Sequence, residues 1–121
     1  MIPGTSYSPA KAFVNFCLEF FSALAVEDYQ AALGKLDSTS ERWSKARLLQ
    51  ELRAVIGAES ICSPGGIAQS ASPELQRTDS GFTLRHRLPV AGTWAQAKAI
   101  FEFQRKANSE YFKVFFRGFE A

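Results

Sequence analysis

The sequence offers few side chains that could perform chemistry, and His86 is its only histidine. An imidazole works as a general acid or base only when an orienting carboxylate and a substrate proton lie within reach. His86 alternates with Leu84 and Leu88 in an apolar strand pattern, and no acid is brought beside it by spacing. We therefore expect a buried structural histidine, which would become a candidate for acid–base work only if it faced a cavity.

The two cysteines, Cys17 and Cys62, do not indicate a reactive or metal-binding site. Cys17 lies in an apolar helical pattern, where a thiol behaves as a small hydrophobic side chain. There is no CxxC motif and no histidine cluster, so we expect no metal. Residues 63–66 lack the spacing of a phosphate-binding loop and are typical of a turn. The sequence predicts no catalytic set and no cofactor, which favours a non-enzymatic protein.

Charge and hydropathy exclude several classes of partner. The 121 residues carry a formal net charge of +2, and the basic residues are spread along the chain among acids. A nucleic-acid-binding protein would concentrate them on one face. No apolar run approaches the roughly 20 residues that span a bilayer, and the N-terminus does not have the pattern of a signal peptide. We expect no nucleic acid, no membrane and a cytoplasmic location.

The C-terminal part of the chain contains a possible docking surface. Basic side chains alternate outward on the predicted strands, and the segment around Phe112 is apolar on both faces. The chain's own helices can cover only one face, so the other predicts a protein partner or a second copy. Aromatic and arginine side chains dominate binding hot spots. The candidate contacts are Arg85, Arg87, Trp94, Phe112, Lys113 and Phe116.

Three predicted helices precede these strands. Residues 1–7 are expected to form a flexible arm, and Ser8 with Pro9 suits the start of a helix that runs to about residue 25. A short second helix follows, with Asp28 in its first turn. The third has Ser44 as a candidate N-cap and Gly57 as a candidate C-cap. The first helix has an apolar stripe at spacings of three and four: Phe13, Phe16, Cys17, Phe20, Phe21 and Leu24.

After Gly81 the apolar period changes to two, which predicts a sheet. Strands are expected over residues 82–88, 97–105 and 110–119, joined as an antiparallel meander, with Pro89 ending the first. Residues 58–81 are harder to interpret, and short strands at 59–62 and within 67–74 are possible. The whole pattern predicts one α+β domain over residues 1–121, with helices in 8–56 and mostly sheet in 58–121.

The segment of residues 20–33, FFSALAVEDYQAAL, resembles the opening of the nuclear-transport-factor-two-like superfamily. There, an aromatic helix ends and an acidic–aromatic step begins the next helix. The order of predicted elements is similar to that superfamily over most of the chain. The resemblance implies a cone-like domain in which N-terminal helices pack on a curved antiparallel sheet. The superfamily contains ketosteroid isomerases, ligand carriers, dimerisation modules and proteins that neutralise bacterial toxins.

The resemblance leaves three functional hypotheses. The first is an immunity-type protein that neutralises a cognate bacterial toxin by docking. The second is a pocket enzyme or carrier of the ketosteroid-isomerase type, lined by Tyr29, Trp43 and His86. In those isomerases the catalytic base lies on the sheet, and no strand pattern here turns an acid inward, so Asp28 is better explained by its helix. The third is a homodimeric module that pairs through the sheet.

Overall fold

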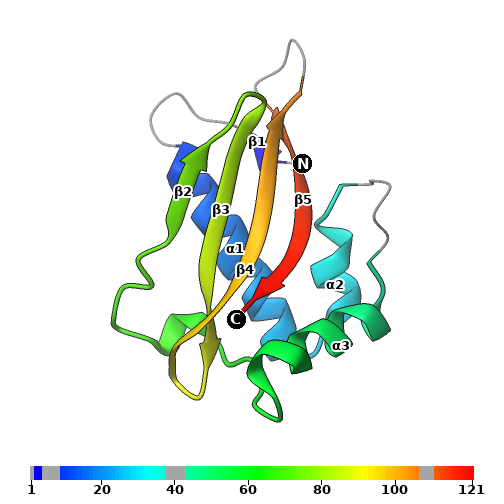
Figure 1. Ribbon diagram of the computed structural model, residues 1–121, viewed down its shortest axis with the longest axis vertical. Helices are drawn as coiled ribbons and strands as arrows, with labels where there is room; N and C mark the ends of the chain where they lie inside the picture. Colours follow the sequence, from blue (N-terminus) through cyan, green and yellow to red (C-terminus); the bar gives the residue numbers. More distant parts are fainter. Residues whose placement is uncertain (1, 4–8, 38–42, 107–110) are drawn as a thin grey trace.

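The computed structural model describes residues 2–3, 9–37, 43–106 and 111–121. These residues form an α+β domain, as predicted, with three helices before a curved antiparallel sheet. One face of the sheet is crossed by α1, whereas α2 and α3 lie near its lower end (Figure 1). The helices are α1 (Pro9–Ala25), α2 (Tyr29–Gly34) and α3 (Lys45–Ile56), followed by the short 3₁₀ helix η1 (Pro64–Gly66). The strands are β1 (Ile2–Pro3), β2 (Glu74–Arg77), β3 (Gly81–Val90), β4 (Thr93–Arg105) and β5 (Tyr111–Glu120).

The helix ends follow from local capping. The carboxylate of Asp28 accepts a hydrogen bond from Ala31 N at 3.1 Å, so this residue is the N-cap of α2 and not part of its first turn. The Ser44 hydroxyl accepts from Arg47 N at 3.1 Å, which confirms the predicted start of α3. Gly57 ends that helix at φ 65°, a conformation that glycine adopts without a steric penalty.

The sheet has the strand order β1-β5-β4-β3-β2, and β3, β4 and β5 form the predicted meander. The expectation that Pro89 ends β3 is wrong. A bulge between Arg87 and Pro89 lets the strand continue, and Pro89 pairs with Trp94. A proline has no N–H to donate to a neighbouring strand, so a bulge is one of the few places in a sheet that tolerates it.

Residues 58–81 contain less strand than the sequence suggested. Instead of a strand at 59–62, there is a single bridge between Ile61 and Val90. The strand expected within 67–74 begins only at Glu74, where β2 pairs with β3. Short apolar runs beside prolines and glycines do not distinguish a strand from an irregular packed segment, and the tertiary contacts decide between the two.

The start of the chain adds a strand to the sheet. Ile2 pairs with Phe112 and Pro3 with Tyr111, so β1 extends the sheet beyond β5. The expectation of a flexible arm is corrected at these two residues, and residues 4–7 of that arm lie outside the described residues. The backbone groups at the start of β5 are therefore already paired within the chain.

Two side chains protect the rest of the β5 edge. Asp37 binds Val114 twice: its backbone N–H donates to Val114 O at 2.9 Å, and its carboxylate accepts from Val114 N at 2.7 Å. Further along, the indole N–H of Trp43 donates to Phe116 O at 2.9 Å. An unpaired edge strand is a template for another chain. Together with β1, these contacts remove β5 as a site for edge-to-edge pairing.

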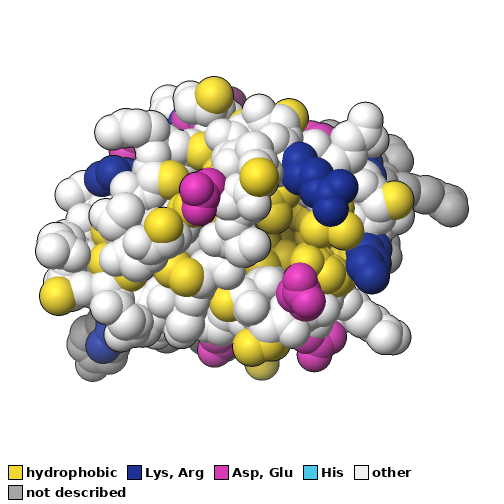
Figure 2. Space-filling model, turned by 90° about the horizontal axis from the view of Figure 1, so that it is seen from below, with side chains coloured by type: hydrophobic (Ala, Val, Ile, Leu, Met, Phe, Trp, Pro, Cys, Tyr) yellow, Lys and Arg dark blue, Asp and Glu magenta, His cyan; other side chains and the backbone are white. Residues whose placement is uncertain are grey.

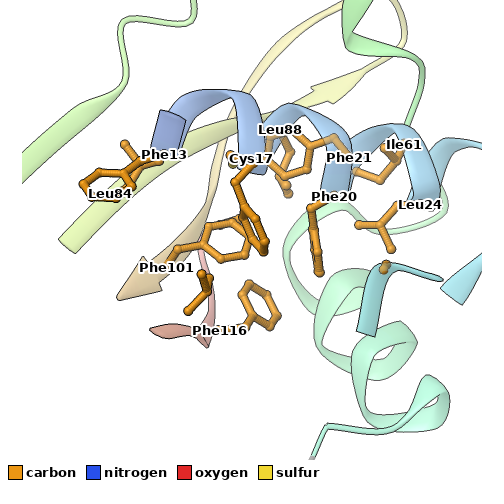
Figure 3. Packing of buried hydrophobic residues seen from close by; sticks show 14 of the residues in the cluster. Phe13, Cys17, Phe20, Phe21, Leu24, Ile61, Leu84, Leu88, Phe101 and Phe116 are labelled. Atoms are coloured by element: carbon orange, nitrogen blue, oxygen red, sulfur yellow. The ribbon is translucent and has the colours of Figure 1, made fainter. Parts of the chain in front are cut away.

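The space between α1 and the sheet is filled by aromatic rings. Phe13 stacks on Phe103 with ring centroids 4.1 Å apart. The ring centroid of Phe101 lies 5.1 Å from those of both Phe20 and Phe116. These three rings interdigitate between the helix and the strands (Figure 3). Edge-on and tilted ring pairs of this kind add to the stabilisation from apolar burial. The enclosed pocket that the sequence placed between helices and sheet is thus occupied by core side chains.

Candidate functional site

Three of the predicted contact residues belong to the core. Trp94 is 8% exposed, Phe112 0% and Phe116 2%. The indole N–H of Trp94 donates to Gln69 O at 2.8 Å, which anchors the ring beneath the segment before β2. Phe112 and Phe116 face α1 because strand alternation places them with the other inward rings. These three residues have almost no surface to offer a partner, so we remove them from the candidate contacts.

The opposite face of β5 does not need a partner to cover it. Phe115 is the large apolar side chain on that face, yet it is only 8% exposed. The guanidinium of Arg117 lies over its ring, 5.3 Å from the centroid. The same guanidinium is held by Glu102, with Nε to Oε2 at 2.8 Å. Phe115 is therefore covered within the chain, whereas Tyr111 at the start of β5 is 49% exposed.

Most of the basic side chains on the outer sheet face are neutralised. Three of them form ion pairs with acidic side chains. The nitrogen–oxygen distances are 3.4 Å for Arg85 with Glu120, 3.5 Å for Lys98 with Glu74 and 2.8 Å for Arg117 with Glu102. Arg87 instead donates to two backbone carbonyls, those of Ala95 at 2.7 Å and Trp94 at 2.5 Å. Lys113 remains exposed. A paired, mixed surface of this kind has little long-range attraction for an acidic partner.

The three residues predicted to line one pocket lie apart. Trp43 packs on Phe116, with ring centroids 4.6 Å apart. The guanidinium carbon of Arg47 lies 4.0 Å from the centre of the Trp43 ring. His86 lies in the core, while Tyr29 lines a cleft at the end of the molecule. Alternation and helical spacing placed each residue on an apolar face, but they did not show which faces meet.

His86 is a structural residue, as its sequence pattern suggested. It is 1% exposed, and its ring lies 5.4 Å from that of Phe21 and 5.2 Å from that of Trp94. Its Nδ1 lies 2.8 Å from Arg87 O, so this nitrogen carries the proton and donates it to the carbonyl. Burial lowers the pKa of His86, and the hydrogen bond to Arg87 opposes that effect. None of the hydrogen bonds described for this ring involves a carboxylate, so its geometry does not support acid–base catalysis.

The buried imidazole predicts that the protein loses stability in mild acid. Because the pKa of His86 is lower in the folded state than in the unfolded state, unfolding takes up a proton once the pH falls below about 6.5. We expect the urea midpoint to be steady above that pH and to fall from pH 6.5 to 5.5. The contribution of one group cannot exceed about 1.4 kcal/mol per pH unit. A His86→Gln variant should lack this part of the pH dependence, and an equal fall in the variant would contradict the prediction.

The described residues form an open cleft of about 1010 Å³ between the end of α1, the start of α2, α3 and residues 57–61. Figure 2 shows this end of the molecule as a hollowed hydrophobic area, with basic and acidic side chains at its margins. Its lining residues are Leu24, Ala25, Val26, Glu27, Tyr29, Leu49, Leu52, Arg53, Gly57, Ala58, Glu59, Ser60 and Ile61. We call this feature the cleft.

The polar groups of the cleft gather around Tyr29. Burial and the nearby Glu27 carboxylate raise the pKa of its hydroxyl, whereas Arg53 lowers it. Lys45 Nζ lies 5.4 Å from the centre of the Tyr29 ring. Within the described part of the chain Arg53 forms no ion pair, so its guanidinium remains available at the cleft margin. The cleft thus offers a hydroxyl, a cation and a carboxylate beside an apolar floor.

A second, smaller hollow adjoins the cleft. It has a volume of about 290 Å³ and shares Glu59 with the cleft. Its apolar walls come from α3 and from the hairpin of β3 and β4, including Val55, Ile56 and Ala95. At the other side of the cleft, Val26 is 75% exposed. The cleft, with its apolar floor and polar margins, and this hollow lie at one end of the molecule, which we call the apolar end face.

Metal-ligating side chains and the Cys17 thiol bear on whether the described residues could support catalysis. Among the residues that the structure describes, no three His, Cys, Asp or Glu side chains are grouped so that they could hold a metal ion. The thiol of Cys17 is buried, and that burial raises its pKa, which disfavours the reactive thiolate. None of the described helices is long and apolar enough to cross a membrane.

No family model matches this chain, and neither curated proteins nor solved structures give a significant match. The layout of helices on one face of a curved antiparallel sheet is compatible with the shape of the superfamily named above. The functional inference therefore depends on the geometry of the chain itself.

Most of the cleft could not be predicted from the sequence. Leu49 and Leu52 have the spacing of an ordinary apolar helix face, and no motif around Arg53 indicates a binding role. The break at residues 26–28 was a usable signal, because it leaves the apolar Val26 outside a helix. Glu27 there adopts φ 58°, a left-handed conformation that turns the chain toward α2. The remaining lining comes from residues 57–61, which have no regular pattern.

Proposed function

We propose that this protein is a non-enzymatic binding domain that holds a partner protein at the apolar end face. The observation that carries the proposal is the cleft of about 1010 Å³ with an apolar floor and charged margins, which shares Glu59 with an apolar hollow. Protein interfaces have this anatomy, with a desolvated apolar centre inside a polar rim. An apolar surface left open at one end of a small domain is a characteristic interaction site.

The cleft is suited to a side chain or loop supplied from outside. Leu24, Leu52 and Ile61 form a rigid floor, since each is at least nine-tenths buried in the core. Leu49 is half-buried on the wall, and Arg53 is exposed above it. An apolar anchor entering the cleft would be desolvated by the floor, while a carboxylate at its edge would pair with Arg53. A partner with an apolar anchor flanked by an acid fits this chemistry.

The resemblance to the nuclear-transport-factor-two-like superfamily adds a concrete form to the proposal. Members of that superfamily include bacterial immunity proteins, and we infer that this chain neutralises a cognate toxin by docking. The location of the docking surface differs from the first expectation, because the outer sheet face is largely paired within the chain. The partner would be held at the end of the domain.

A small-molecule carrier is the second candidate, and the size of the cleft favours it. Ligand pockets measure about 300–1,000 Å³ and combine an apolar lining with a few polar groups. Tyr29 and Arg53 could supply those groups. The cleft is open to solvent and has a second hollow beside it, which favours a partner protein over a small molecule. A ligand screen by thermal unfolding would identify a carrier, because binding to the native state raises the unfolding temperature.

The test compares capture of a partner by the wild type and by matched variants. Arg53→Glu reverses an exposed charge at the cleft, and Leu49→Arg places a charge on its wall. Lys113→Glu reverses an exposed charge on the outer sheet face and serves as the control. We expect one stoichiometric partner, retained by Lys113→Glu and lost by both cleft variants. Circular dichroism would verify that the variants are folded.

The opposite pattern would contradict the proposal. Loss of the partner only in Lys113→Glu would place docking on the sheet, as the sequence first suggested. Light scattering provides a further check: a dimer that Arg53→Glu separates into monomers would make the occupant a second copy of this chain. Capture that is equal in all variants would also refute docking at the cleft.

A further inference from the structure

A second cavity lies at the opposite end of the sheet from the cleft. It has a volume of about 340 Å³ and lies where the turn between β2 and β3 meets the end of β4 and the start of β5. This is the upper end of the sheet in Figure 1. The described residues that line it are Arg77, Thr78, Asp79, Ser80, Gly81, Phe82, Arg105, Lys106 and Phe112. We call it the basic cavity.

The basic cavity holds the excess positive charge of the protein. Three of its lining residues are cations, Arg77, Arg105 and Lys106, and only Asp79 is acidic. The difference of two equals the formal net charge of the whole chain, so the remaining charges balance. Within the described residues none of the three cations forms an ion pair. This contrasts with the outer sheet face, where most cations have acidic partners.

Backbone hydrogen bonds hold the walls of the basic cavity in place. Thr78 N donates to Gly81 O at 2.8 Å, which closes the turn between β2 and β3. Arg105 N donates to Ser80 O at 2.8 Å and ties that turn to β4. The Arg105 guanidinium lies 4.7 Å from the centre of the Phe112 ring. Within the described residues the Arg105 side chain makes no hydrogen bond or ion pair, so its N–H groups can donate to an anion.

A buried hydroxyl in the same wall lacks a partner. Thr78 Oγ1 is buried and makes no hydrogen bond within the described residues. Buried polar groups are almost always satisfied, and each exception calls for a physical reason. A hydroxyl can donate to an anionic oxygen while cations neutralise the anion's charge. The unpaired cations indicate an anionic occupant, and Thr78 lies in the wall that such an occupant would touch.

We propose that the basic cavity binds the phosphate group of a small phosphate monoester. A phosphate monoester carries a charge of about −1.5 to −2 at pH 7 and offers three strong acceptor oxygens. That charge matches the excess in the cavity, and two guanidinium groups with an ammonium group supply the donors. A phosphate alone would leave part of the volume unfilled. The half-buried Phe82 ring in the wall provides a surface for a small organic group on the ester.

Titration with inorganic phosphate and with phenyl phosphate tests this proposal. Calorimetry at constant ionic strength should show binding of both, with phenyl phosphate tighter and acetate producing no saturable signal. Arg105→Gln and Arg77→Gln should each weaken phosphate binding at least about tenfold, because a hydrogen bond to a charged group is lost. Arg85→Gln is the matched control, since it removes an arginine that pairs with Glu120 on the outer sheet face and does not line the basic cavity.

Thr78→Val tests whether the hydroxyl contributes to phosphate binding or only to the stability of the fold. Valine has nearly the same shape without the unsatisfied hydroxyl, so the variant should unfold at a higher temperature in phosphate-free buffer. It should also show a smaller rise in unfolding temperature when phosphate is added. Equal binding by Arg85→Gln and Arg105→Gln, or equal signals from acetate and phosphate, would overturn the proposal. These outcomes do not depend on whether a partner protein occupies the cleft.

Discussion

Replacing Phe101 with alanine is expected to lower the free energy of unfolding by about 3–5 kcal/mol. The residue is completely buried, and its ring contacts those of Phe16, Phe20 and Phe116. Removing it leaves a cavity in the middle of the layer between α1 and the sheet. The loss combines the transfer of the ring to water with the contacts that the neighbouring rings forfeit.

Urea unfolding followed by tryptophan fluorescence would measure this loss. Tyr111→Ala provides the comparison, because that aromatic residue lies on the same sheet but is 49% exposed. We expect a change below about 1 kcal/mol for this surface position. A loss at Phe101 no larger than at Tyr111 would show that the aromatic layer is loosely packed.

Gly81→Ala is expected to destabilise the protein by at least about 3 kcal/mol, near the upper end for overpacking. A Cβ at this position would overlap the carbonyl oxygen of Phe103 and lie 2.9 Å from the carbonyl carbon. The obstructing atoms belong to the backbone of β4, which is held in register on both sides. No side-chain rotation can relieve the overlap, so the pairing of β3 with β4 must shift.

Gly34→Ala separates this steric effect from the general effect of replacing glycine. Gly34 is the last residue of α2, and a Cβ there meets no atom within 4 Å. Since alanine favours a helix over glycine, we expect the variant to be stabilised by about 0.5–1 kcal/mol. Thermal unfolding of the two variants should therefore move in opposite directions. Similar shifts in both would mean that the close approach at Gly81 does not control stability.

The two proposed binding sites lie at opposite ends of the sheet and can be tested independently. The cleft depends on α1, α3 and residues 57–61, whereas the basic cavity depends on the turn between β2 and β3 and on the end of β4. They share no lining residue. A phosphate compound that weakened capture of the partner protein would indicate energetic coupling through the sheet.

Local sequence patterns determined most of the secondary structure. The stripe of phenylalanines in residues 9–25 has helical spacing, and α1 has these bounds in the structure. Ser44 and Gly57 are capping residues because one offers a hydroxyl acceptor and the other adopts a positive φ. Alternation after Gly81 placed His86 correctly on the inward face. Such features depend on neighbours within a few residues, so the sequence is sufficient to predict them.

Burial and pairing across the sheet were decided only by the tertiary structure. Phe112 and Phe116 were expected at a docking surface, but α1 covers that face, and Arg117 covers the ring of Phe115 on the other. Arg85 was expected to bind a partner, but the strand register brings Glu120 to it from 35 positions along the chain. These outcomes depend on contacts between distant segments.

The sequence by itself determined the α+β class, the caps of α3 and the inward faces of β3 and β4. The tertiary structure decided which face stays open, which charges are paired and where the cavities lie. The cleft forms from four segments. The basic cavity forms from the turn between β2 and β3 and the adjoining ends of β4 and β5, joined by a hydrogen bond between Arg105 and Ser80. Local periodicity specifies the direction of a side chain relative to its own element, whereas a site requires the relative placement of several elements.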